Sequence, residues 1–193
     1  MYAYLNGQLT YKSPTTLHID INGVGYLVNI SLNTYSKIES LDSAKLYTYL
    51  HVKEDQLTLF GFHDEEERSL FILLLSVSGI GPNTARIVLS SMSPLEVRTA
   101  ILTDNDVAFK KVKGVGPKTA KRIILDLRDK VQKGGAMSTD TTIPVLSTSQ
   151  DEALDALVAL GFVKAKVQKV LDQLPASGAS VEVLIKSALQ KLT

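Results

Sequence analysis

The chain has 193 residues, in which 21 Lys and Arg nearly balance 20 Asp and Glu, with 45% hydrophobic residues and neither Cys nor Trp. This is an ordinary globular composition, and the absence of cysteine excludes disulfides, a thiol nucleophile and a cysteine-ligated zinc site. Three scattered histidines, His18, His51 and His63, do not supply a metal cage. The sequence has no secretion-signal pattern and no apolar run of the roughly 18 to 20 residues that span a membrane, so we expect a cytoplasmic protein without membrane contact, metal or cofactor.

Charge is distributed unevenly along the chain. Residues 1–63 carry 4 basic and 5 acidic side chains (net −1), residues 64–133 carry 12 and 9 (+3), and residues 134–193 carry 5 and 6 (−1). Within the middle block, residues 105–133 hold nine Lys or Arg against three Asp, a net +6. A polyanion is expected to bind there first.

Residues 1–63 follow the period-two pattern of short strands. Apolar residues alternate with polar ones over 17–21, and the turn sequence Asn-Gly-Val-Gly at 22–25 separates this run from a second one at 26–30. The pattern predicts a hairpin closed by glycines at positive φ. Further runs of this kind occupy 2–9, 44–52 and 56–62. About five strands in some sixty residues favour a small closed barrel of the OB type, with an SH3-like barrel as the alternative.

From residue 64 the pattern becomes helical. Asp64 is placed to cap a helix whose first turn is the acidic run 65–67, and Ser93-Pro94-Leu95-Glu96 has the spacing of a capping box. Asp104 is predicted to cap another helix. We expect four or five short helices forming a compact bundle that ends near Lys133.

A change in composition marks the rest of the chain. Residues 134–149 contain ten Gly, Ser, Thr or Pro and a single charge, so we predict a flexible linker there. Residues 150–193 fit three helices, separated at 160–162 and 175–178, and form a very small independent domain. The predicted organisation is therefore α+β and multidomain, with a barrel over 1–63, a helical domain over 64–133, the linker, and a three-helix, UBA-like domain.

The helical block contains an internal repeat. Val-Ser-Gly-Ile-Gly-Pro-Asn-Thr-Ala at 77–85 returns 35 residues later as Val-Lys-Gly-Val-Gly-Pro-Lys-Thr-Ala at 112–120, with six of nine positions identical. Each copy lies between an apolar helical run and a helix that begins at proline. The repeat therefore predicts two tight hairpins, each joining two helices.

The two hairpins have the chemistry of phosphate-binding sites. Glycine accepts unusual backbone angles and lets a ligand approach the main chain, while the first turn of the following helix presents unpaired N–H groups. Contacts of this kind position a nucleic-acid backbone without reading bases. The candidate DNA-binding residues are Gly79, Gly81, Asn83, Gly114, Gly116, Lys118, Lys121 and Arg122.

Three other interpretations explain the repeat less well. A dinucleotide-binding turn is disfavoured because Thr84 and Thr119 stand at the third glycine position, and no buried strand precedes the second copy. A P-loop is excluded because Pro117 stands where a glycine must precede the lysine. Plain helix connectors would explain one copy, but they explain poorly two copies with basic side chains around the second.

The order of barrel, paired helix-hairpin-helix motifs (GIGPNTA and GVGPKTA), Gly/Ser/Thr linker and a final unit containing ALVALGF at 156–162 resembles the RuvA family of bacterial Holliday-junction recognition proteins, over essentially the whole chain. The resemblance implies a homotetramer, alone or as two tetramers per junction, that binds four-way junction DNA sequence-independently in recombination, repair and the SOS response. It also implies the RuvB hexameric ATPase and the RuvC resolvase as partners.

The resemblance assigns roles to residues that the pattern alone does not. Glu54 and Asp55 match an acidic pin that repels phosphates and holds the junction centre open, whereas without the family they are a solvated turn. In the last domain, Leu157, Leu160 and Phe162 are candidates for contact with the ATPase. The family often has lysine where this chain has Asn83, so the first hairpin is expected to rely on backbone amides.

The resemblance also implies a non-catalytic subunit of an ATP-driven complex, with no catalytic or metal-binding residues. Two alternatives remain at this stage. One is a structure-selective nuclease using Glu54 and Asp55 as metal ligands, although two carboxylates without a third ligand make a poor Mg²⁺ site. The other is an accessory helix-hairpin-helix module of a different repair enzyme.

Overall fold

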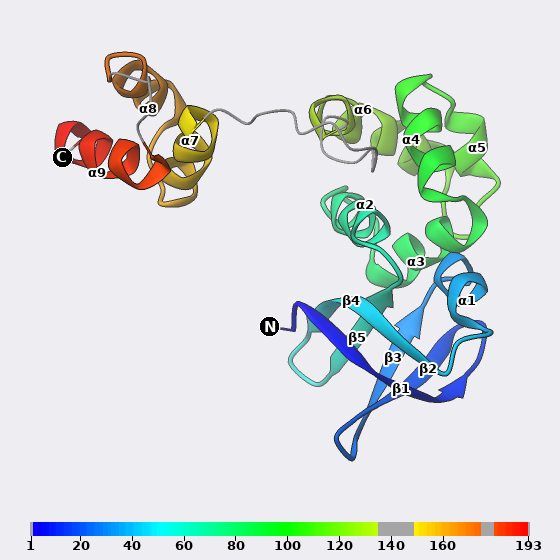
Figure 1. Ribbon diagram of the computed structural model, residues 1–193. Helices are drawn as coiled ribbons and strands as arrows, with labels where there is room; N and C mark the ends of the chain where they lie inside the picture. Colours follow the sequence, from blue (N-terminus) through cyan, green and yellow to red (C-terminus); the bar gives the residue numbers. More distant parts are fainter. Residues whose placement is uncertain (1, 135–148, 175–179, 193) are drawn as a thin grey trace. The chain divides into compact units, whose positions relative to one another are not determined.

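The computed structural model describes residues 2–134, 149–174 and 180–192 (Figure 1). It forms two compact units, residues 1–139 and 140–193. The predicted linker at 134–149 lies outside the described residues except for its two end positions.

The N-terminal part of the first unit is a closed five-stranded barrel (Figure 1). Its strands are hydrogen-bonded in the order β1-β2-β3-β5-β4, and all neighbours are antiparallel except β3 and β5. This order confirms the predicted OB-type barrel over the SH3-like alternative. The strands are β1 (Tyr4–Lys12), β2 (Thr16–Ile21), β3 (Val24–Ile30), β4 (Ser43–Val52) and β5 (Leu57–Phe62).

The predicted hairpin between β2 and β3 is confirmed, but of its two glycines only Gly23 adopts positive φ, because Gly25 lies within β3. Asn22 and Gly23 both have positive φ, 53° and 86°, and the Gly23 N–H donates to Asp20 Oδ1 at 3.0 Å. Two consecutive positive φ values give the turn a twist that matches the strands on either side. Alternation along β2 then places Leu17 and Ile19 in the barrel core without exposed surface.

One helix in the barrel was not predicted. Helix α1 (Leu32–Ile38) connects β3 to β4, and the Ser31 side chain caps it by accepting from the Thr34 N–H. Its sequence, LNTYSKI, is only seven residues long, which is too short to establish a helical repeat. The serine cap was the available signal.

Five helices follow the barrel, as predicted (Figure 1). The Asp64 cap is confirmed by its bond from the Glu67 N–H at 2.8 Å, and the Ser93 and Glu96 capping box is complete. The cap predicted at Asp104 is wrong, because Asp104 adopts a left-handed φ of 53° and Asn105 accepts the capping bond from Ala108. The helices are α2 (Glu65–Leu75), α3 (Pro82–Ser91), α4 (Pro94–Leu102), α5 (Asp106–Lys110) and α6 (Pro117–Gly134).

The barrel and the helices share part of one apolar core. Phe60 and Phe62 of β5 pack against Phe71 of α2, with ring centroids 5.1 and 4.9 Å apart, and Tyr49 of β4 meets the same ring at 5.4 Å. Phe60, Phe62 and Phe71 are fully or almost fully buried. This packing fixes β4 and β5 against the helical part of the unit.

A buried carboxylate adds a polar brace at the same junction. Glu67 of α2 has no exposed surface and accepts hydrogen bonds from Ser31 and from Thr34 Oγ1, the latter at 2.7 Å. Thr34 Oγ1 in turn accepts from the His63 N–H at 3.0 Å. Burial raises the pKa of Glu67 above its usual value, although the Ser31 and Thr34 hydrogen bonds act in the opposite direction.

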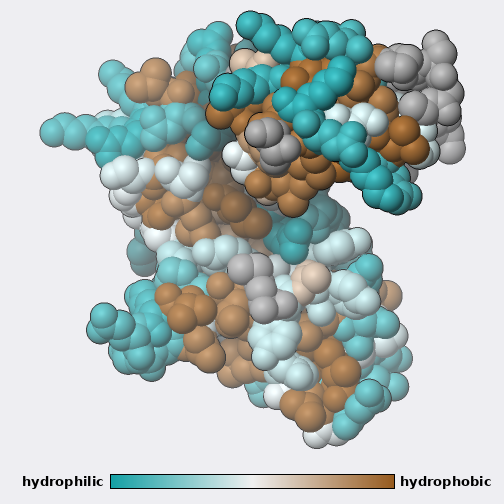
Figure 2. Space-filling model, turned by 90° about the vertical axis from the view of Figure 1, so that its left-hand side faces the viewer, coloured by the Kyte–Doolittle hydropathy of each residue, from teal (hydrophilic) through white to brown (hydrophobic). Residues whose placement is uncertain are grey.

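The barrel surface carries apolar side chains as well as polar ones. Figure 2 shows apolar patches over the barrel, in the lower half of that view. Large side chains that stay exposed on the barrel include Tyr4, Tyr11, Val24, Leu27, Val52 and Leu57.

The second unit contains three helices among its described residues, α7 (Ser149–Ala159), α8 (Lys164–Leu171) and α9 (Val181–Leu192). They enclose a small apolar core formed by Ala153, Leu154, Leu157, Val167, Leu171, Leu184 and Ala188. The predicted three-helix domain is thereby confirmed. Within the described ranges, no helix has both the length and the apolar character needed to cross a membrane.

The raised pKa of Glu67 predicts a pH-dependent contribution to stability. A carboxyl whose pKa is higher in the folded state contributes most below its unfolded-state pKa, and this contribution is lost as pH rises through the folded value. Glu67→Gln removes the titrating group. We therefore expect the difference in unfolding free energy, wild type minus variant, to fall as pH rises above about 4.5 in urea titrations. A difference that stays constant over this range would contradict the assignment.

Candidate nucleic-acid interface

The two copies of the repeat adopt the same backbone conformation. The first hairpin, residues 76–81, joins α2 to α3, and the second, residues 111–116, joins α5 to α6. In both, the N–H at the fourth repeat position donates to the carbonyl at the first: Ile80 to Val77 and Val115 to Val112, each at 3.1 Å. The preceding glycines have almost equal positive φ values, 92° at position 79 and 89° at position 114.

Buried aliphatic side chains hold the hairpins from inside. Val77 and Ile80 in the first copy, and Val112 and Val115 in the second, belong to the helical core. The glycines of both copies are exposed. A Cβ added at position 79, 81 or 116 would meet no atom within 4 Å, and at Gly114 it would meet only Thr84 Oγ1 at 3.9 Å. The glycine surfaces are therefore open to a ligand.

Each hairpin leads directly into a helix N-terminus without a capping side chain. Gly81 is the cap residue of α3 and Pro82 occupies its first turn. The first intrahelical bond runs from Ala85 to the Gly81 carbonyl, and the second copy repeats it from Ala120 to Gly116, both at 2.9 Å. The N–H groups of the first turn have no intrahelical partner and carry the positive end of the helix dipole, which favours an anion.

Unpaired positive charge gathers at the second hairpin. Lys110 is paired with Asp106 and Arg128 with Asp104, both at 2.7 Å. Four exposed lysines of this region form neither an ion pair nor a side-chain hydrogen bond within the described part of the chain, namely Lys111, Lys113, Lys118 and Lys121. They are the side chains available to neutralise phosphates.

Helix α6 also connects the two hairpins, which the sequence did not indicate. Arg122 donates from its NH1 group to the Ser78 carbonyl of the first hairpin at 3.2 Å, and Lys130 Nζ donates to Ser76 Oγ at 3.0 Å. A basic side chain following the second copy therefore lies at the first. Asn83, by contrast, is exposed and supplies no charge to its own hairpin.

The predicted acidic pair lies at the tip of the β4–β5 hairpin. Glu54 and Asp55 are exposed, and the turn is closed by a hydrogen bond from the Lys53 N–H to the Gln56 carbonyl at 2.9 Å. Among the described residues, no group of three or more His, Asp or Glu side chains is arranged to hold a metal ion.

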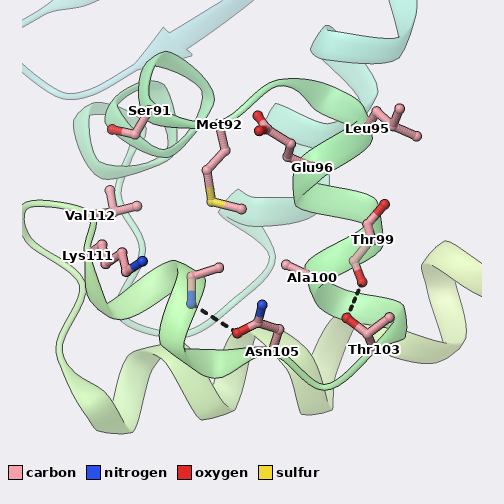
Figure 3. Close-up of a pocket in the computed structure, with 11 residues that line it drawn as sticks. Ser91, Met92, Leu95, Glu96, Thr99, Ala100, Thr103, Asn105, Lys111 and Val112 are labelled. Carbon is pink, nitrogen blue, oxygen red and sulfur yellow. Dashed lines mark hydrogen bonds between the residues drawn. The ribbon is translucent and has the colours of Figure 1, made fainter.

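A pocket that the sequence did not predict lies behind the second hairpin, between α4 and α5 (Figure 3). It has a volume of about 510 Å³, and the Met92 side chain points into it whereas Leu95 points away. Its one carboxylate, Glu96, is engaged by the capping box with Ser93, which lowers its pKa. Lys111 lines the pocket and is also the first residue of the second hairpin.

In the second unit, the three residues predicted to contact a partner differ in burial. Leu157 is fully buried in the core, so it cannot contact a partner without repacking, and this part of the prediction is corrected. Phe162 is half-buried against the core. Leu160 is 64% exposed, and Val163, which was not among the predicted contacts, is exposed to the same degree.

A closed OB-type barrel followed by two helix-hairpin-helix bends defines a multidomain helix-hairpin-helix protein. Comparison with family models is more specific. Residues 1–61 match the RuvA N-terminal domain, residues 71–129 a SAM-like helix-hairpin-helix tandem, and residues 148–193 the RuvA C-terminal domain.

Curated relatives match over the full chain. Proteins of Bacteroides fragilis and Flavobacterium psychrophilum are 47% and 45% identical, with all of both chains covered. A Geobacter metallireducens protein is 43% identical over 100% of this chain and 99% of its own. Each is named Holliday junction branch migration complex subunit RuvA. The chain belongs to the RuvA family.

The hairpin glycines provide a test of the backbone geometry. Gly114→Ala should lower the unfolding free energy by about 1 to 2 kcal/mol, because a Cβ is strained at positive φ. Gly116→Ala should change it by less than about 0.5 kcal/mol, because that position has neither positive φ nor a close neighbour. Denaturant unfolding of both variants measures the difference, and equal destabilisation would show that the two glycines do not have these distinct roles.

Proposed function

We propose that this chain is a subunit of a Holliday-junction branch migration complex that binds four-way junctions independently of sequence. The observation that carries the proposal is the pair of matching hairpins, each with open glycines and unpaired amides beside buried aliphatic anchors. Such amides bind phosphate oxygens and read no base. The designated binding residues are Gly79, Gly81, Asn83, Gly114, Gly116, Lys118, Lys121 and Arg122.

The acidic turn supplies the second part of the proposed mechanism. Glu54 and Asp55 are exposed on a hairpin whose strands are fixed against α2 by the shared aromatic core. Carboxylates held near crossing DNA strands repel their phosphates, and the repulsion is stronger at low salt. The turn thus keeps the centre of the junction open without cutting it, and the subunit itself is non-catalytic.

We further propose that four subunits assemble around one junction, singly or as two facing tetramers. Residues 1–63 supply the acidic turn, 64–133 bind the arms, 134–149 connect them to the last domain, and 150–193 recruit the RuvB ATPase, with Leu160 and Val163 as exposed contacts. The assembly works with RuvC in the cytoplasm, in recombination and repair.

Two other functions are less well supported. A nuclease would need a third metal ligand beside Glu54 and Asp55, and an accessory duplex-binding module would not need an acidic turn fixed in the same compact unit as its hairpins. Incubating labelled junction with the protein and Mg²⁺ tests the nuclease, because cut product would favour that function. The ratio of junction to duplex affinity distinguishes an accessory duplex-binding module from the proposed junction-binding subunit.

Salt dependence tests the proposed binding mode. If each of the eight hairpins of a tetramer neutralises one phosphate, log K should fall with log salt at a slope of roughly −7, since each phosphate contributes about 0.9. Lys118→Ala removes four charges per tetramer and should reduce the slope, whereas Lys164→Ala, an exposed lysine of the other unit, should not. The measurement is a titration of a labelled four-way junction at several salt concentrations, repeated with a labelled linear duplex. A wild-type slope shallower than about −2, or equal affinity for duplex, would contradict the proposal.

A further inference from the structure

The β4–β5 hairpin continues past the end of the barrel core. In the ladder between these strands, Leu50 pairs with Leu59 and the next inward-facing pair is Val52 with Leu57. Alternate residues of a strand share one face, so both pairs lie on the face that is directed toward the barrel interior. The turn bearing Glu54 and Asp55 follows immediately.

Burial along this face changes abruptly at the last pair. Leu59 belongs to the barrel core and Leu50 packs partly against it. Val52 and Leu57 are 63% and 68% exposed. The row of core-facing side chains on β4 and β5 therefore ends in two adjacent, exposed aliphatic side chains, immediately before the acidic turn.

The acidic turn restricts what can cover these two side chains on DNA. Carboxylates repel phosphates, so the sugar-phosphate backbone is not a favourable neighbour for this part of the hairpin. Base rings are uncharged on their faces and lose water favourably against aliphatic groups. When base pairs separate at an opened crossover, such faces are exposed and need a surface. Aliphatic side chains that insert beside unstacked bases are a known means of stabilising distorted DNA.

We propose that Val52 and Leu57 form an apolar wedge that packs against the bases released at the centre of an opened junction. The proposal rests on the proposed function, because only a subunit that opens junctions meets such bases. The carboxylates keep phosphates away, and the wedge gives the freed bases a surface that competes with re-pairing.

A fluorescent base at the crossover provides the test. A four-way junction with 2-aminopurine at its central base pairs reports unstacking as increased fluorescence. Wild-type protein should raise the signal, and Val52→Thr with Leu57→Thr should lose most of the increase and bind the junction about tenfold more weakly, with duplex affinity unchanged. Val24→Thr with Leu27→Thr is the matched control, because these barrel residues are 54% and 57% exposed and lie on β3. The control should behave as wild type.

Conservative and charge variants complete the experiment. Val52→Ile with Leu57→Met keeps the apolar surface and should retain the signal. Wild-type fluorescence from the threonine variant, while Glu54→Gln with Asp55→Asn alters it, would overturn the wedge and leave the proposed function intact. Dissociation of the DNA-free threonine variant into smaller species on size-exclusion chromatography would also overturn it, since the face would then be a subunit contact. If wild-type protein binds junctions without a fluorescence change, both the proposed opening of the junction and the proposed wedge are contradicted.

Discussion

The positive φ at Gly79 and Gly114 is the constraint on which the proposed binding site depends. A side chain at either position would strain the bend, and without the bend the aliphatic residues on both sides could not all face the core. With it, Val77 and Ile80, or their counterparts in the second copy, are buried while the main chain between them faces outward. Burial of the aliphatic side chains therefore holds the bend rigidly, with its backbone amides facing outward.

Buried side chains also fix the barrel against the helices. Phe60 and Phe62 belong to a barrel strand but pack into the helical core, and Glu67 of α2 accepts hydrogen bonds from Ser31 and Thr34 at the start of α1. The acidic turn and the two hairpins consequently belong to one compact unit. A protein proposed to recognise the shape of DNA needs this rigidity, because shape can be read only by contacts whose spacing is fixed.

Much of this arrangement was predictable from sequence, for identifiable reasons. The strands, the hairpin at Asn22 and Gly23, the Asp64 cap and the capping box at Ser93 all depend on interactions within a few residues, and the repeat revealed itself by duplication. Helix α1 was missed because it is too short to show a period. The cap at Asp104 was misplaced by one residue, because Asn105 and Asp104 are both good capping types and only the backbone distinguishes them.

The remaining features arise from contacts between distant parts of the chain. The Arg122 bond to Ser78 spans 44 residues and the Thr34 bond to Glu67 spans 33. No local pattern encodes either. Burial of Leu157 likewise depends on how three helices pack, so a list of apolar residues at helical spacing could not separate core positions from exposed ones such as Leu160.

The central claim, that the glycine bends bind phosphates through bare amides, can be observed directly. In ¹⁵N–¹H TROSY spectra of deuterated protein, adding a DNA junction should shift the amide resonances of Gly79, Gly81, Gly114 and Gly116 downfield, as expected for new hydrogen bonds to phosphate. The shifts should be the same for junctions of unrelated sequence. If these four resonances stay in place while those elsewhere in the first unit move, the bends are not the DNA-binding surface.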